Sequence, residues 1–186
     1  MAVFETERLV VDDWTEEPAD VARFLDTYSR DEVIRWLGGG APPLADEVEA
    51  AGRIRRWRAR NAEHGPPYGI WAVRVRETGL AVGTVLLLPM PGAGMARTDQ
   101  VEVGWHLHPD SWGHGYATES ARGALVRGFA AGLPEIYAVI WPGNTRSEAV
   151  TRRLGMTPLG RRTDWYDGAE VDAFVARKAP LLSLSI

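Results

Sequence analysis

The sequence predicts a mixed α/β (α+β) fold in one domain, on three observations. The chain has 186 residues, close to the size of one ordinary domain. Its residues are 45% hydrophobic and 25% charged, which is typical of a folded globular protein and not of a disordered chain. Helical and strand patterns alternate along the chain without an internal repeat. We therefore expect a single domain over residues 1–180, followed by a short C-terminal tail at 181–186.

The first third of the chain combines a β-prone segment with two helices. Phe4–Val11 favours a strand, and Thr15 is a good helix cap because acidic residues and a proline follow it. That helix should reach about Tyr28. A second helix is predicted over Leu44–Glu63, because apolar residues recur there every three or four positions. Its expected buried stripe comprises Leu44, Val48, Ala51, Ile54 and Trp57.

The middle of the chain predicts three strands and a helix. Ile70–Arg76 and Gly79–Leu88 alternate as strands on either side of a turn. Val101–Leu107 predicts a third strand, and Tyr116–Ala131 a helix with small or apolar residues at four-residue spacing. On the third strand, alternation places Val101, Val103 and Trp105 on one face and Glu102, Gly104 and His106 on the other.

The last part of the chain returns to the same alternation. Ile136–Trp141 predicts a strand, and Thr145–Leu154 a helix that Gly155 ends. Segments around Thr157–Thr163 and Val171–Arg177 are predicted to be closing strands.

Composition excludes several classes of function. The absence of cysteine excludes a disulfide scaffold, a thiolate metal site and a cysteine nucleophile. His64 and His108 have no carboxylate at ligand spacing, so we expect no metal. A net charge of -4 argues against nucleic acid as a partner. Pro89 and Pro91 break the longest uncharged stretch, Thr78–Ala96, so we expect no membrane partner; without a visible signal peptide, a cytoplasmic location is the default.

The segment that carries chemistry leads from the strand ending at Leu107 into the helix that begins at Tyr116. Gly113 and Gly115, just before that helix, allow close backbone approach and can aim free N–H groups at an anion. These residues alone leave two readings open, a phosphate loop and a tightly packed glycine turn. Two better-known phosphate loops are excluded, because the Walker pattern does not allow tyrosine at position 116 and the dinucleotide pattern does not allow Thr118.

Here the sequence resembles a known family. Trp112-Gly113-His114-Gly115-Tyr116-Ala117 is similar to the diphosphate loop Q/R-x-x-G-x-G/A of the GNAT superfamily of acyl-CoA-dependent N-acetyltransferases. Asn144-Thr145-Arg146-Ser147, followed by Leu154-Gly155-Met156, resembles that family's N-x-x-S/A and L-G-F/M motifs. Phe4-Glu5-Thr6-Glu7-Arg8-Leu9 resembles the opening of its RimJ/RimL-like branch, which includes the ribosomal-protein N-terminal acetyltransferases. The resemblance spans about Phe4 to Lys178.

The resemblance implies a central, mostly antiparallel sheet, splayed at Val101–Leu107 and flanked by helices, with acetyl-CoA as co-substrate. Splaying would free backbone groups of that strand to bond the pantetheine arm. The amides from Gly113 to Thr118 would hold the diphosphate, with the His114 side chain on the outer side. Asn144 would bond the pantetheine arm, cap the following helix, or do both. The expected coenzyme-binding residues are Trp105, His106, Leu107, Trp112, Gly113, His114, Gly115, Tyr116, Ala117, Thr118, Asn144 and Ser147.

The implied reaction is direct attack of a primary amine on acetyl-CoA in a ternary complex. Because such amines are partly or mostly protonated at neutral pH, a general base is useful. A backbone N–H near Leu107 could bond the oxyanion. Many family members carry a tyrosine proton donor where this chain has Thr151; the branch implies Ser147 instead, and Tyr166 is a second candidate. The candidate bases, left open, are Asp164, Glu102 and His106.

The acceptor also stays open. The branch favours a peptide or protein α-amine; a small amine such as an antibiotic, polyamine or amino acid is the alternative. The missing tyrosine keeps a third possibility, a catalytically silent acyl-CoA-binding module. Acids such as Glu32 could attract either kind of cation. Trp36, Trp57 and Trp71 could line an acceptor cleft or belong to the core. Monomer and homodimer both remain open.

Overall fold

The computed structural model describes residues 1–38, 42–92, 94 and 96–178. The tail expected at 181–186 lies outside the described residues. In chain order the elements are β1 (Phe4–Glu5), β2 (Leu9–Asp12), α1 (Pro18–Tyr28), α2 (Asp31–Ile34), α3 (Glu47–His64), β3 (Gly69–Val75), β4 (Ala81–Pro91), β5 (Arg97–Leu107), α4 (Tyr116–Ala130), β6 (Glu135–Ile140), α5 (Thr145–Arg153), β7 (Thr157–Arg162) and β8 (Val171–Arg177).

The strands form one eight-stranded sheet of order β1-β2-β3-β4-β5-β6-β8-β7. Every neighbouring pair is antiparallel except β5 and β6, which run parallel. In these described strands β5 and β6 share a single paired position, Glu102 with Tyr137, whereas β5 stays paired with β4 as far as Leu107. The β6-facing edge of β5 is therefore open beyond Glu102. The predicted mixed, mostly antiparallel and splayed sheet is confirmed.

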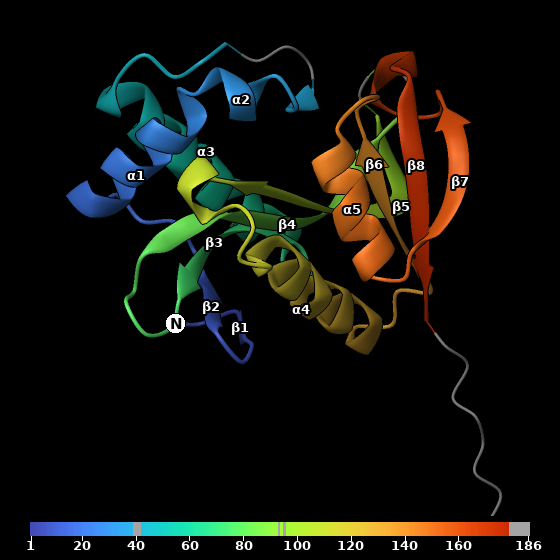
Figure 1. Ribbon diagram of the computed structural model, residues 1–186, viewed down its shortest axis with the longest axis horizontal. Coiled ribbons are helices and arrows are strands. Elements are labelled where there is room, and N and C mark those ends of the chain that lie inside the picture. Colours follow the sequence, from blue (N-terminus) through green and yellow to red (C-terminus); the bar gives the residue numbers. More distant parts are fainter. Residues whose placement is uncertain (39–41, 93, 95, 179–186) are drawn as a thin grey trace, which may run out of the picture.

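Helices cover both faces of the sheet (Figure 1). On one face, α4 packs against β4 and β5, and its Ala121 and Ala124 share a buried cluster with Val101 and Val103. On the other face, α1 and α3 pack over β3 and β4 around a second cluster that contains Phe24. The predicted faces of β5 are thus confirmed, with its even-numbered side chains directed toward the α1 side. Helix α5 packs beside β6 (Figure 1).

Helix α1 is tied to the sheet by a largely buried ion pair. Both terminal nitrogens of Arg74 donate to the Asp20 carboxylate at 2.7 Å, and Arg74 Nε donates to Asp12 at 2.8 Å. Burial alone would raise the pKa of Asp20, but hydrogen bonds from Arg74 and Thr15 hold that pKa below its usual range. The carboxylate therefore stays charged at neutral pH.

Two predicted elements differ in detail. Phe4–Val11 is a hairpin and not one strand, since Phe4 pairs with Val11 and the turn between them is held by bonds to Glu119 of α4. Helix α1 begins at Pro18 with Glu17 as its N-cap residue, so the prediction that Thr15 caps it was wrong; the Thr15 hydroxyl instead donates to Asp20 at 2.7 Å. Helix α2 was not predicted, because four residues are too few to show a periodic pattern.

The predicted stripe of the second helix was wrong at one position. Asp46 caps α3 by accepting the Glu49 N–H at 2.9 Å, so the helix begins at Glu47 and not at Leu44. Ala50 is buried, whereas Val48 is 76% exposed. Two residues rotate the chain by about 200° in a helix, which places Val48 on the side opposite Ala50.

Candidate active site

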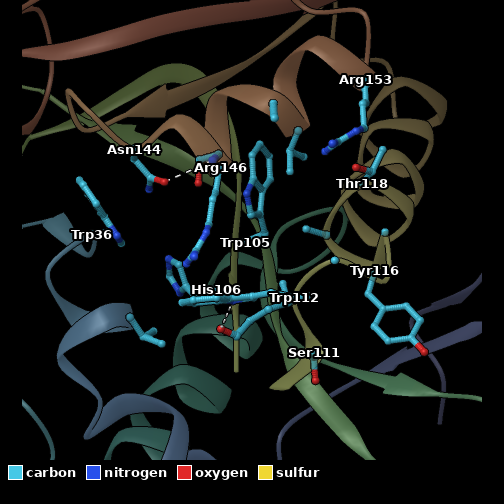
Figure 2. Close-up of a pocket in the computed structure, with 18 of the residues that line it drawn as sticks. Trp36, Trp105, His106, Ser111, Trp112, Tyr116, Thr118, Asn144, Arg146 and Arg153 are labelled. Atoms are coloured by element: carbon cyan, nitrogen blue, oxygen red, sulfur yellow. Dashed lines mark hydrogen bonds between the residues drawn. The ribbon is translucent and has the colours of Figure 1, made fainter. Parts of the chain in front are cut away.

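A cavity of about 480 Å³ lies beside the open edge of β5 (Figure 2). Its walls come from the end of β5, the turn into α4 with the first residues of that helix, α5 along its length, and the α2 region. Of the residues predicted to bind the coenzyme, all except His114 line this cavity. The splayed sheet thus brings the predicted loop and the predicted α5 residues to one place.

The turn into α4 presents free backbone donors. Gly113 and Gly115 have φ angles of +83° and +81°, which glycine adopts without strain. Gly115 is the N-cap residue, and the Glu119 N–H makes the first helical bond, to the Gly115 carbonyl at 3.0 Å. Within the described part of the chain, the N–H groups from Gly115 to Thr118 have no acceptor. Such a helix start can bind an anion.

The end of β5 directs further donors to the cavity. The His108 N–H bonds the Val82 carbonyl of the β4 side at 3.0 Å. Because N–H groups alternate in direction along a strand, the Leu107 N–H points to the open edge instead. The Leu107 carbonyl accepts from Trp112 Nε1 at 3.0 Å, which fixes that indole in the wall. The Arg146 guanidinium lies over the same indole, 4.1 Å from the ring centre (Figure 2).

Asn144 and Ser147 start α5 at the cavity wall. The Asn144 Oδ1 atom caps the helix by accepting the Ser147 N–H at 3.2 Å. Among the described residues the Asn144 Nδ2 atom has no hydrogen-bond partner. The cap and a bond to the pantetheine arm are therefore compatible. Thr151, at the position where many family members have tyrosine, is buried and donates to the Glu148 carbonyl at 2.8 Å.

His106 is held by a buried chain of polar side chains. Its Nδ1 atom lies 3.3 Å from the Tyr28 hydroxyl, which donates to Thr84 Oγ1 at 2.7 Å. Trp14 Nε1 donates to the same Thr84 oxygen at 3.0 Å. Burial lowers the pKa of His106 to about 4. The imidazole at the cavity wall is therefore neutral at pH 7 and fixed in orientation.

Glu102 and Tyr166 form a second polar pair on the same face of β5. The Tyr166 hydroxyl donates to Glu102 Oε1. Burial raises the pKa of Glu102 to about 7, against the opposing effects of this hydrogen bond and of Arg60. Tyr166 has a φ of +51°, which is strained for a bulky side chain and is found most often at functional sites. Burial and the nearby Glu102 charge raise the pKa of Tyr166.

Asp164 stands apart from these groups. It is exposed, and its Oδ2 accepts from Arg162 Nε at 2.6 Å, which lowers its pKa. None of Asp164, Glu102 and Tyr166 lines the cavity described above, whereas the candidate base His106 does. His114 is exposed as well, with its ring stacked on Tyr116 at 5.5 Å. Its position matches the outer side that we expected.

Some cavity residues were not predicted as site residues. They are Glu32, Val33, Trp36, Ser111, Arg146, Ala149, Val150 and Arg153. Sequence patterns raised Glu32 and Trp36 only as acceptor candidates, whereas Trp57 and Trp71 belong to the core. Arg146 and Arg153 are seven positions apart on α5 and so share a helix face, so helical spacing could have indicated one of them once the other was placed at the site.

A metal centre or a membrane-spanning helix in the described ranges, residues 1–38, 42–92, 94 and 96–178, would change the class of site. In those ranges no group of three or more His, Asp or Glu side chains is placed to hold a metal ion. No helix in them is both long and apolar enough to cross a membrane.

Comparisons with known proteins agree with this geometry. Residues 8–157 match the acetyltransferase (GNAT) domain family. An Aspergillus fumigatus protein named FsC-acetyl coenzyme A-N(2)-transacetylase is 33% identical over 140 residues, 73% of this chain; this match spans 57% of the fungal protein's length. The uncharacterized N-acetyltransferase YoaA of Bacillus subtilis is 26% identical, with 93% of this chain and 94% of YoaA covered.

Solved structures show the same fold. A GNAT-family acetyltransferase from Bacillus anthracis has a TM-score of 0.73 at 18% identity, with 93% of this chain and 96% of that chain covered. RimL, a ribosomal L7/L12 alpha-N-protein acetyltransferase solved with coenzyme A, has a TM-score of 0.74 at 12% identity, with 95% and 98% covered. The chain therefore belongs to the GNAT acetyltransferase family and carries its acetyl-CoA-dependent N-acetyltransferase domain.

Proposed function

We propose that the cavity holds acetyl-CoA along the open edge of β5 and transfers the acetyl group to a primary amine that enters from the α2 side. One observation carries this proposal. The unpaired edge at Leu107 and the free N–H groups from Gly115 to Thr118 face one cavity. An extended amide arm can form hydrogen bonds with the unpaired edge of β5, and a diphosphate can accept hydrogen bonds from the free N–H groups.

In the proposed mechanism Glu102 acts as general base through a water molecule. A base with a pKa near the working pH is the most effective, and burial raises the pKa of Glu102 to about 7. The neutral amine nitrogen attacks the thioester carbon, and the amine proton passes through water to Glu102. His106, held neutral on the same face of β5, orients the acceptor and this water.

Collapse of the tetrahedral intermediate completes the transfer. The Leu107 N–H, directed to the open edge, bonds the oxyanion. The C–S bond then breaks, and the thiolate takes a proton from the Ser147 hydroxyl, which regains one from solvent. Ser147 suits this role because the Asn144 cap fixes its backbone in the first turn of α5, at the cavity wall.

For the acceptor we propose a peptide or protein α-amine. The N-terminal motif Phe4–Leu9, which resembles the RimJ/RimL-like branch, supports this choice. Glu32 and Trp36 of the α2 region line the acceptor side and suit a cation beside an apolar side chain. A small-molecule amine is the second candidate, because the fungal relative is named an N(2)-transacetylase and its name mentions no peptide or protein acceptor.

The test is an acceptor screen with acetyl-CoA that follows thiol release and product mass. Peptides with a free N-terminus and no lysine are compared with the same peptides N-acetylated, and with polyamines, aminoglycosides and amino acids. We expect thiol release only with the unblocked peptides. Acetylation of the small amines alone would establish the second candidate. Binding of coenzyme A with no turnover of any amine would contradict both and indicate a silent module.

A further inference from the structure

We propose that Arg8, in the turn between β1 and β2, is a positioning residue for the diphosphate loop. It holds the His114 carbonyl away from the cavity and so directs the Gly115 N–H into it. Arg8 is far from the loop in sequence and does not itself line the cavity. This inference rests on the proposed coenzyme site and assigns a role to the N-terminal hairpin.

The Arg8 guanidinium is fixed by groups around it. Its Nη1 atom donates to the His114 carbonyl at 3.1 Å. Its Nε atom donates to Glu119 Oε2 at 2.7 Å, and its Nη2 atom lies 2.6 Å from the same oxygen. The guanidinium also lies 5.1 Å from the centre of the Tyr116 ring. A bond to a carbonyl from a cation held at this many points is well directed.

Peptide geometry connects this bond to the cavity. The His114 carbonyl and the Gly115 N–H belong to one planar trans peptide, so they point in opposite directions. Gly115 lines the cavity and His114 does not. Gly115 adopts φ +81°, but a glycine can adopt many other backbone conformations as well. The local sequence therefore does not fix the orientation of this peptide. The bond from Arg8 fixes it, with the N–H toward the expected diphosphate.

Glu119 completes the arrangement. Besides Arg8 Nε, this carboxylate accepts the Thr6 hydroxyl at 2.6 Å and the Arg8 N–H at 2.8 Å. Burial would raise the pKa of Glu119, but these hydrogen bonds lower it below its usual range, so the group stays charged. A carboxylate in the first turn of α4 would repel a bound diphosphate. The Arg8 guanidinium, which is bonded to the Glu119 carboxylate, offsets that negative charge beside the loop.

The hairpin offers a matched control. Arg76 donates to the Thr6 carbonyl at 2.7 Å and to Glu5 at 2.8 Å. It therefore braces the same turn, but in the described part of the chain its guanidinium bonds neither the diphosphate loop nor α4. Arg8→Gln and Arg76→Gln each remove one exposed guanidinium from the hairpin. Only Arg8→Gln removes the arginine partner of the His114 carbonyl and of Glu119.

The experiment compares two acetyl donors, acetyl-CoA and S-acetylpantetheine, which has no diphosphate. For Arg8→Gln we expect the Kd for coenzyme A and the KM for acetyl-CoA to rise roughly tenfold, the loss of one charge-assisted bond. The kcat and the KM that are measured with S-acetylpantetheine should both stay within twofold of wild type. Arg76→Gln should leave all four quantities within twofold.

Several outcomes would overturn the proposal. Equal losses with both donors, or equal losses in Arg8→Gln and Arg76→Gln, would mean that the hairpin acts only through the fold. Unchanged coenzyme A affinity in Arg8→Gln would mean that the orientation of the His114 carbonyl does not depend on its bond from Arg8. If Arg8→Gln fails to fold, Arg8→Lys replaces it, because a lysine keeps the positive charge beside Glu119 but lacks the planar fork of donors that reaches both Glu119 and the His114 carbonyl, with the same expected split between donors. Wild-type protein that binds no coenzyme A would instead overturn the proposed function.

Discussion

Glu102 is the residue whose protonation state the proposed chemistry depends on most. Alternation along β5 predicted its face, because side-chain direction in a strand follows from sequence spacing alone. Its hydrogen-bond partner Tyr166 lies 64 residues away, and only the folded chain joins them. A motif nominated Asp164 as a base, but in the folded chain it is exposed and pairs with Arg162, two residues before it. Backbone conformation at Gly113 and Gly115 was predictable because glycine itself permits it.

A pH profile of kcat/KM tests the role of Glu102. A general base acts when deprotonated, so activity should rise through pH of about 7 and then level off. His106 would not produce this inflection, because burial lowers its pKa to about 4. We expect Glu102→Gln to lower kcat by roughly 10²- to 10⁴-fold and to remove the inflection. The control Asp164→Asn should change neither. A reversed pattern in the two variants would assign the base to Asp164.

Elements with a strong local signal were the ones that the sequence predicted well. Helix α5 ends where expected, since Gly155 at φ +72° accommodates the left-handed turn. The conformation of the other elements depends on contacts between residues far apart in the sequence. The β1–β2 turn is set by bonds to Glu119, and α1 is anchored by Arg74 of β3. Helix α2, which supplies the acceptor wall, is too short for its pattern to be visible.

The ion pair between Asp20 and Arg74 should be the main polar anchor of α1. Their side chains are 8% and 17% exposed, so removing one charge leaves the other poorly solvated. We expect Asp20→Asn to lower the free energy of unfolding at pH 7 by about 3 kcal/mol, as for other broken buried pairs. Urea titration measures this difference. The exposed Asp164→Asn should have no measurable effect.

The same pair has a predictable pH dependence. The pKa of Asp20 is lowered in the folded state, so its stabilising effect is complete above its unfolded pKa of about 3.9. It is lost as the pH falls through the lower folded value. The stability difference between wild type and Asp20→Asn should therefore shrink in acid. A difference that stays constant down to pH 3 would contradict this assignment.

The order of the family motifs along the chain implied the splayed, mostly antiparallel sheet that the whole molecule has. Composition and periodicity alone predicted alternating helices and strands, but they could not order the strands or locate the splay. The β5–β6 separation follows from parallel strands that share one paired position, which is a property of the assembled sheet. That separation places α4, α5 and α2 around one cavity. We propose that this cavity binds acetyl-CoA.

Thermal unfolding with and without acetyl-CoA tests that claim directly. At a hundred times its Kd, a ligand that binds only the folded state adds about 2.7 kcal/mol, which for a chain of this size raises Tm by roughly 5 to 10 °C. Gly115→Glu should abolish the rise, because a residue with a Cβ is strained at φ +81° and its Cβ would lie 3.4 Å from Arg8 Nη2, so the loop would lose the conformation that presents its N–H groups. Val126→Glu, which adds the same charge to an exposed position of α4, should keep it. No rise at millimolar acetyl-CoA, or an equal rise in Gly115→Glu, would contradict the claim.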